Sequence, residues 1–234
     1  MSTSDDKIPE EFKEELLKVR AKQKELAAQI DLQNRIELGD IRFISGFDVA
    51  FDDESNFACA GVVTIDFRTF ELIEEQIEFF KPKIPYIPSF LHYREAPGYH
   101  KVWEKLEEKP DILMFDGNGI IHPFGIGLAS QMGLELNHPS IGVAKKLLLG
   151  EYKEPITKGG FSYITRDNEN IGAAFQTAKK PAKPIYISPG HRVDLKTTIN
   201  IIRMFSLKQK FLGKLPLPIK LADTLVRERL EGEI

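Results

Sequence analysis

The chain has 234 residues, of which 42% are hydrophobic and 29% charged, a composition typical of a soluble globular protein. Cys59 is the only cysteine, which excludes an internal disulfide, and no apolar run reaches the roughly 20 residues that a membrane span needs. We therefore expect one domain over residues 1–234, in a cytoplasmic monomer without a membrane anchor.

The net charge of −3 argues mildly against a nucleic-acid partner, since such domains are usually basic overall. The distribution of charge matters more than the sum. Basic side chains dominate residues 179–183 and 196–214, and a basic face on a neutral protein can still hold phosphates. A solvated helix surface explains these charges equally well.

The first 79 residues predict a helix followed by three strands. Apolar side chains recur at helical spacing over residues 10–32, among glutamates and lysines. Mostly apolar runs then occupy residues 42–51, 57–66 and 70–79, with short connections between them. Three consecutive strands joined in this way favour an antiparallel meander.

The rest of the chain alternates between predicted helices and strands. Three prolines within residues 81–89 exclude a helix or an inner strand and indicate a stiff exposed loop. The order predicts an α/β fold: a mixed sheet with an antiparallel three-strand meander plus parallel strands, flanked by helices. The expected helices are residues 93–108, 124–136, 194–205 and 219–229, and the expected strands are residues 111–115, 140–143, 161–165, 171–175 and 185–188.

Two aspartates stand in unusually apolar surroundings. Asp48 lies inside the run ISGFDVAF, and Asp116 ends the run DILMF and is followed by Gly117. A buried carboxylate costs several kcal/mol unless a metal ion or a basic side chain compensates its charge. Either aspartate alone is equally well explained by a salt bridge or a turn cap. Two of them on strands that can be neighbours favour a shared site.

Glu95, in HYREAP, reads by itself as a solvated glutamate near a helix start. Mg²⁺ prefers hard oxygen ligands and takes a few protein carboxylates besides water and phosphate. Asp48, Glu95 and Asp116 can supply that set, with Mn²⁺ as a substitute metal. The set indicates a metal-dependent phosphodiester hydrolase.

Five segments resemble the endonuclease V family, which acts on deoxyinosine. They are ISGFDVAF, PYIPSFLHYREAP, PDILMFDGNGIIHPFGIGLASQMG, HPSIGVAKKLLLG and SPGHRVDL, in family order from about residue 44 to 195. The resemblance implies a ribonuclease H-like fold, Mg²⁺ dependence, inosine-containing DNA as the partner, and cleavage at the second phosphodiester bond 3′ to the lesion. Inosine in RNA is a further expected substrate.

The resemblance also assigns roles by position. Asp48, Glu95 and Asp116 match the family's catalytic acids, and Tyr86 of PYIP matches a wedge that fills the gap left by a flipped base. A proline-stiffened aromatic suits that task, because it replaces lost stacking with little ordering. The positions that match the base pocket and its surroundings are Ser89, Leu91, Gly117, His122 and Leu148.

Two further polar residues match the family motifs. His191, in SPGHRVDL, is a candidate general acid or base near the metal, although a lone histidine is as often a structural hydrogen-bonder. Lys145, in GVAKK, is a candidate for neutralising the scissile phosphate. Asp223 is open to two interpretations, a structural helix residue or part of the outer site.

The chain departs from the family pattern at two positions. Ser89 and Ala96 stand where the family usually has glycine, and Ser89 adds a side chain beside the expected pocket. Inosine specificity is therefore a separate question from nuclease activity. The alternatives are a structure-selective nuclease for flaps or junctions, and a non-catalytic module for modified nucleic acid. The three carboxylates count against the module, which would have no use for groups that repel phosphate.

Overall fold

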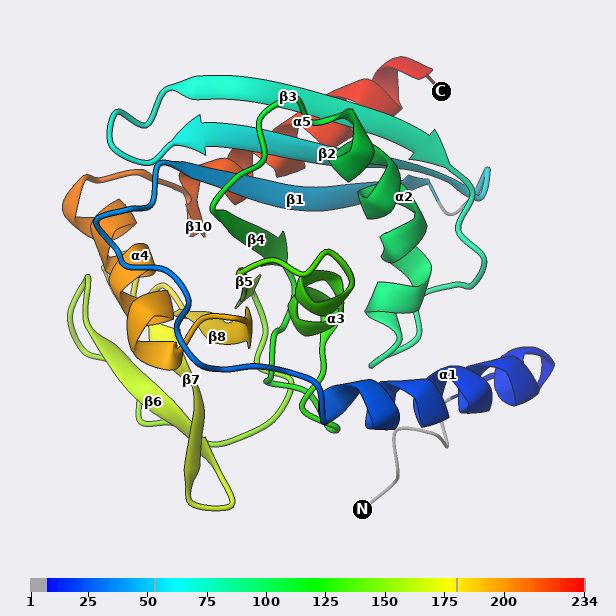
Figure 1. Cartoon of the computed structure of the whole chain (residues 1–234), viewed down its shortest axis with the longest axis horizontal. Coiled ribbons are helices and arrows are strands. Elements are labelled where there is room, and N and C mark those ends of the chain that lie inside the picture. Colours follow the sequence, from blue (N-terminus) through cyan, green and yellow to red (C-terminus); the bar gives the residue numbers. More distant parts are fainter. Residues whose placement is uncertain (1–7, 53, 180, 234) are drawn as a thin grey trace.

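The computed structural model describes residues 8–52, 54–179 and 181–233. These residues build one eight-stranded sheet with helices on both faces, and a small two-stranded hairpin (Figure 1). None of the helices in these ranges is both long and apolar enough to cross a membrane. The elements are η2 (Glu10–Phe12), α1 (Lys13–Ala27), β1 (Phe43–Asp52), β2 (Phe57–Asp66), β3 (Leu72–Phe80), α2 (Leu91–Lys105), β4 (Ile112–Asp116), α3 (Leu128–Glu135), β5 (Ser140–Ala144), β6 (Phe161–Arg166), β7 (Glu169–Phe175), β8 (Ile185–His191), α4 (Leu195–Leu207), β9 (Phe211–Leu212), β10 (Leu215–Pro216) and α5 (Leu217–Glu233).

The strand order β3-β2-β1-β4-β5-β8-β7-β6 confirms the predicted mixed sheet. β1, β2 and β3 pair in antiparallel fashion, as the three consecutive apolar runs predicted. β4 and β5 continue the sheet in parallel with β1. Antiparallel β8, β7 and β6 then complete the other half.

Glycines on β1 and β2 let α5 approach the sheet closely. A Cβ atom at Gly46 would lie 2.3 Å from the backbone carbon of Pro218, and one at Gly61 would lie 2.4 Å from Cγ1 of Val226. Gly61 is also the register partner of Asp48. The last helix is therefore seated directly over the strand that carries the first candidate acid.

The opposite face of the same strands is covered by α2 and α3. Phe47 of β1 packs on Phe115 of β4 and edge-on against Tyr99 of α2, with all three side chains fully buried. This cluster positions α2, and with it Glu95, against the central strands. The two helical layers leave the carboxyl ends of β1 and β4 between them (Figure 1).

Two predicted helix boundaries were wrong, and one hairpin was missed. The first helix ends at Ala27 rather than at residue 32, because Asp31 forms backbone hydrogen bonds that tie this segment to Arg192 and His191. The third helix begins at Leu128 rather than at residue 124, since Gly125 has a φ of +68° and turns the chain before it. The β9–β10 hairpin was not anticipated.

Candidate active site and adjoining pocket

Asp48 and Asp116 lie side by side because of the sheet register. Phe47 of β1 pairs with Phe115 of parallel β4, so the next residue along each strand is one of the two aspartates. Side chains alternate between the faces of a strand, and both phenylalanines face α2. Both aspartates therefore face α5, and they lie on neighbouring strands, as predicted.

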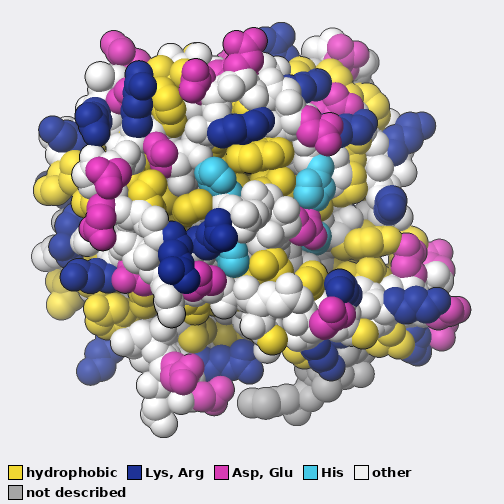
Figure 2. All heavy atoms as spheres, in the orientation of Figure 1, with side chains coloured by type: hydrophobic (Ala, Val, Ile, Leu, Met, Phe, Trp, Pro, Cys, Tyr) yellow, Lys and Arg dark blue, Asp and Glu magenta, His cyan; other side chains and the backbone are white. Residues whose placement is uncertain are grey.

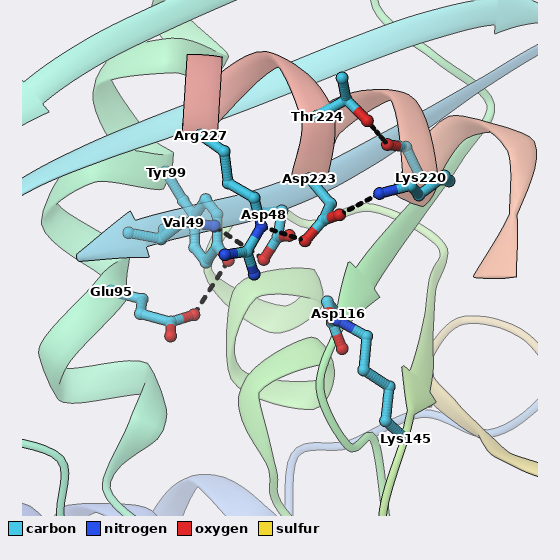
Figure 3. A network of polar contacts seen from close by, with 10 residues as sticks. All are labelled: Asp48, Val49, Glu95, Tyr99, Asp116, Lys145, Lys220, Asp223, Thr224 and Arg227. Atoms are coloured by element: carbon cyan, nitrogen blue, oxygen red, sulfur yellow. Dashed lines mark hydrogen bonds and ion pairs between the residues drawn. The ribbon is translucent and has the colours of Figure 1, made fainter. Parts of the chain in front are cut away.

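Glu95 reaches this region from α2. Its side chain is buried, and its Oε2 accepts a hydrogen bond from the hydroxyl of Tyr99 at 2.9 Å. The negative charges of Asp48 and Asp116 both act on it. The structure thus brings the three predicted acids into one neighbourhood (Figure 3).

Asp223 of α5 is a fourth acid at the same place. It is 5% exposed, and its carboxylate accepts hydrogen bonds from Lys220 at 2.6 Å and from Arg227 at 2.9 Å. Figure 3 shows it beside Asp48, above Asp116. The sequence left its role open. The sequence did hold a signal for its burial, because this acid lies on the same side of the helix LADTLV as the buried Ala222 and Val226.

The carboxylates raise one another's pKa. Burial raises the pKa of Asp48 well above its usual value, and the charge of Asp116 raises it further. Burial likewise raises the pKa of Glu95, with Asp48 as the next cause. The pKa of Asp116 is also raised by burial, although Lys145 opposes that shift. These are acids that lack enough positive charge nearby.

Lys145 supplies part of that charge. It follows β5 directly, and its Nζ lies 2.6 Å from Oδ2 of Asp116. Burial by itself would lower the pKa of Lys145, but the charge of Asp116 outweighs this and the pKa is raised. The lysine is thus in the acidic site, where it was predicted to meet a phosphate.

The chemistry of these donors fits a divalent cation. All are hard oxygen ligands, and their raised pKa values show an unmet need for positive charge. In the described ranges no three acidic, histidine or cysteine side chains are close enough to enclose an ion. Lys145, Tyr99 and the Lys220–Arg227 pair each bind one of the carboxylates.

A pocket adjoins the acidic site on the other side of Gly117. Tyr86 is one of its lining residues and is 64% exposed. Oδ1 of Asn118 is buried without a hydrogen-bond partner. Five predicted substrate-binding residues are therefore together in one cavity. Its lining consists of Tyr86, Ser89, Leu91, His92, Asn118, His122, Gly127, Leu128, Gln131 and Leu148.

Gly117 does not line this cavity. Its N–H donates to the carbonyl of Val143 at 3.0 Å, so it is already part of the β4–β5 pairing. A Cβ atom there would lie 2.8 Å from Cδ2 of Leu128, a lining residue. The residue therefore spaces the pocket from Asp116, and its role in substrate binding stays a prediction.

His122 is a neutral, structural histidine at the back of the pocket. Its Nδ1 accepts a hydrogen bond from the N–H of Phe124 at 3.3 Å, so Nε2 carries the proton and donates to the carbonyl of Ser89 at 3.2 Å. Burial lowers the pKa of His122 to about 4. It shapes the loop around Ser89 without carrying charge.

His191 is not brought to the acidic site. It pairs with Ser140 at the start of β5, whereas Asp116 pairs with Val143 near the end of the same strand. Its Nδ1 accepts from the N–H of Asp31 at 3.2 Å, and the side chain is buried. Because β8 runs antiparallel to β5, it carries the histidine to the opposite edge of the sheet from the acids, and its acid–base role stays a prediction.

On the face shown in Figure 2, acidic and basic side chains are interspersed and no continuous basic stripe crosses it. Residues 196–214, the predicted basic stretch, form most of α4 and the β9–β10 hairpin, on the side of the sheet away from α2 (Figure 1). The basic side chains close to the acids are instead Lys145, Lys220 and Arg227.

Known proteins match this chain over most of its length. The family model described as Endonuclease V matches residues 24–224. The Endonuclease V of Dictyoglomus thermophilum is 42% identical over 214 residues, 91% of this chain and 90% of that protein.

Solved structures agree with that match. The Endonuclease V of Streptomyces avermitilis superposes with a TM-score of 0.84 at 30% identity, over 92% of this chain and 93% of that one. The Ciona intestinalis Endonuclease V, in complex with a 24mer DNA containing an inosine followed by a ribo-adenosine, gives 0.82 at 26% identity, over 94% and 100%.

Proposed function

The chain belongs to the endonuclease V family and is an endonuclease, and from this premise we propose that it hydrolyses the second phosphodiester bond 3′ to a deoxyinosine. Inosine in RNA is proposed as a second substrate. One observation supports this most strongly. A group of carboxylates with too little positive charge nearby adjoins a neutral pocket that is lined in part by an exposed tyrosine. A metal-bound phosphate and a displaced base can therefore be held at the same time.

We propose that Mg²⁺, with Mn²⁺ as a substitute, is held by Asp48, Glu95 and Asp116, with Asp223 facing the same point. When bound, such an ion would act as a Lewis acid on the phosphate and stabilise the leaving oxygen. The carboxylates orient the reacting groups from three elements, β1, β4 and α2, whose spacing is set by the ring of Phe47, packed on Phe115 and Tyr99.

Lys145 would bind the phosphate of the substrate in addition to Asp116. Its side chain is 45% exposed and lies at the rim of the acidic site. Once Asp116 is engaged by a cation, the ammonium can turn to a phosphate oxygen and place the scissile group. A lysine does this as a compact charge with three donors.

The pocket supports recognition of the base. Hypoxanthine has a carbonyl at position 6 and a hydrogen on N1, where adenine has an amine and a bare nitrogen. Backbone N–H groups of Ser89, Leu91 and Leu148, which line the pocket, can donate to the carbonyl, and the unpartnered Oδ1 of Asn118 can accept from N1–H. Tyr86 would fill the gap that the base leaves.

The test is a cleavage panel with mapped products. Strands with one inosine, uracil, mismatch or flap, in DNA and in RNA, are incubated with Mg²⁺, with Mn²⁺ and with a chelator. We expect a nick one nucleotide beyond the inosine, and none with the chelator. Equal cleavage of flaps lacking inosine would instead support the structure-selective nuclease.

A further inference from the structure

The helix α1 is packed against the proline-rich loop of residues 81–90, which carries Tyr86. Ile84, Ile87 and Phe90 from the loop share a small apolar cluster with Leu16 of α1 and Ile8 before it. This cluster is separate from those that hold the sheet. The loop is therefore supported mainly by a helix that takes no part in the acidic site.

Arg20 is the polar centre of this contact. It is only 2% exposed, and its guanidinium lies 4.1 Å from the ring centre of Phe90 and 4.5 Å from that of Phe124. Nη2 donates to Oγ of Ser89 at 2.7 Å, and Nη1 donates to Oε1 of Gln23 at 2.5 Å. A planar fork between two rings holds its partners in one orientation.

Ser89 is held in a conformation that its residue type disfavours. Its φ is +68°, in the left-handed region where a Cβ atom is crowded. Its carbonyl accepts from Nε2 of Gln23 at 3.1 Å and from Nε2 of His122 at 3.2 Å, while its hydroxyl is bound by Arg20. Such backbone persists where the surroundings over-determine it.

We propose that Arg20 and Gln23 are positioning residues, which hold Ser89 and through it the 81–90 loop, so that Tyr86 is ready at the pocket before substrate arrives. The inference rests on the proposed function for its effect on cleavage. Ser89 then serves to couple the loop to α1, because its hydroxyl is directed to Arg20. A loop ordered in advance lowers the ordering cost of substrate binding.

The first experiment measures the loop without any substrate. Hydrogen exchange of the peptide spanning residues 81–90 is compared in wild type, Arg20→Met, Ser89→Ala and Ser89→Gly. Lys18→Met is the matched control, since Lys18 is on the same helix, 74% exposed and paired with Glu14. Methionine keeps much of the packing of the long arginine side chain while removing its charge and its hydrogen bonds.

We expect faster loop exchange in Arg20→Met and Ser89→Ala, with Ser89→Gly between Ser89→Ala and wild type. Alanine keeps the crowded φ without the hydroxyl bond, whereas glycine adopts this φ readily. Exchange in the sheet strands and in Lys18→Met should match wild type. Unchanged loop exchange in both Arg20→Met and Ser89→Ala would overturn the proposal.

The second experiment measures cleavage of an inosine duplex with Mg²⁺. In Arg20→Met the KM should rise about 2- to 10-fold with kcat little changed, because ordering is needed for binding and the acids are untouched. In a Tyr86→Ala background the same change should add little. A fully additive effect, or a loss in kcat alone, would show that Arg20 does not act through Tyr86.

The two proposals fail differently. If wild-type protein leaves inosine strands intact, the proposed function is lost, yet hydrogen exchange still decides whether α1 holds the loop. If Arg20→Met does not fold, Ser89→Ala carries the test, because it removes one partly exposed hydroxyl and leaves the packing of α1 in place.

Discussion

The acidic site and the pocket are neighbours built in opposite ways. The acidic site takes Asp48 and Asp116 from paired strands, so its geometry is set by sheet register. The pocket takes its walls from loops and helix ends, and its shape depends on individual contacts such as His122 to Ser89. The acidic site carries negative charge that is not balanced by nearby positive charge, whereas His122 at the pocket is neutral. On the proposed function, the residues for the chemistry lie on paired strands, and the residues for selecting the base lie on loops and helix ends.

The largest expected effect separates the two regions outright. Asp116→Asn keeps the shape and removes one charge from the acids. We expect cleavage to fall by on the order of 10²–10³-fold or more, since electrostatic stabilisation is lost. Binding of an inosine duplex, measured by fluorescence anisotropy, should persist because the pocket is unchanged. Asp167→Asn is the matched control, because it makes the same change at an exposed aspartate outside the acidic site. Binding lost in parallel with cleavage would contradict the separation.

The next effect is confined to the pocket side. Tyr86→Ala should lower kcat/KM on an inosine duplex about 10- to 100-fold, because stacking on an aromatic is worth about 1–3 kcal/mol per base. The loss should be smaller on single-stranded inosine, where no gap opens in a stack. Tyr163→Ala removes another exposed tyrosine and should have no effect. Equal losses on both substrates would mean that Tyr86 is not a wedge.

The neutrality of His122 gives a pH test. Its pKa falls from 6.5 to about 4 through burial, so the unfolded chain takes up the proton first. The stability contributed by neutral His122 is therefore present above pH 6.5 and lost as pH falls toward 4, by on the order of 1–3 kcal/mol. Urea unfolding between pH 7.5 and 4.5 should show a shallower decline in His122→Gln. Identical pH slopes would refute a neutral buried ring.

What the sequence could predict follows the same division. Asp48 and Asp116 were identifiable because a carboxylate inside an apolar strand is a local anomaly, and neighbouring strands bring such anomalies together. The distance of His191 from the acids could not be predicted, because nothing local fixes whether β8 runs with or against β5. The Arg20–Ser89 contact joins residues 69 positions apart, so no spacing could reveal it. Asp223 carried a local signal, but its place depends on the approach of α5 over Gly46.

The smallest expected effect concerns the joint between the regions. α2 begins at the pocket with Leu91 and also carries Glu95 of the acidic site. The carboxylate of Glu135 on α3 binds two histidines of α2, Nε2 of His100 at 2.8 Å and Nε2 of His92 at 3.0 Å. Burial alone would raise the pKa of Glu135, but hydrogen bonds from the two histidines lower it to about 2. Glu135 in turn raises the pKa of His100 above 6.5.

The sign of the pH dependence follows from both shifts. Because the pKa of His100 is raised, its stabilising contribution is fully present below pH 6.5 and is lost as the pH rises through the pKa of the folded state. Because the pKa of Glu135 is lowered, its stabilising contribution is present above pH 4.5. Glu135→Gln should therefore lower Tm at pH 6 by about 2–4 °C, roughly 1 kcal/mol for a partly exposed pair, and by less at pH 9. Because α2 serves both regions, kcat and KM on an inosine duplex should both shift slightly. A change in only one of them would mean that the pocket and the acids do not share α2 as a common support.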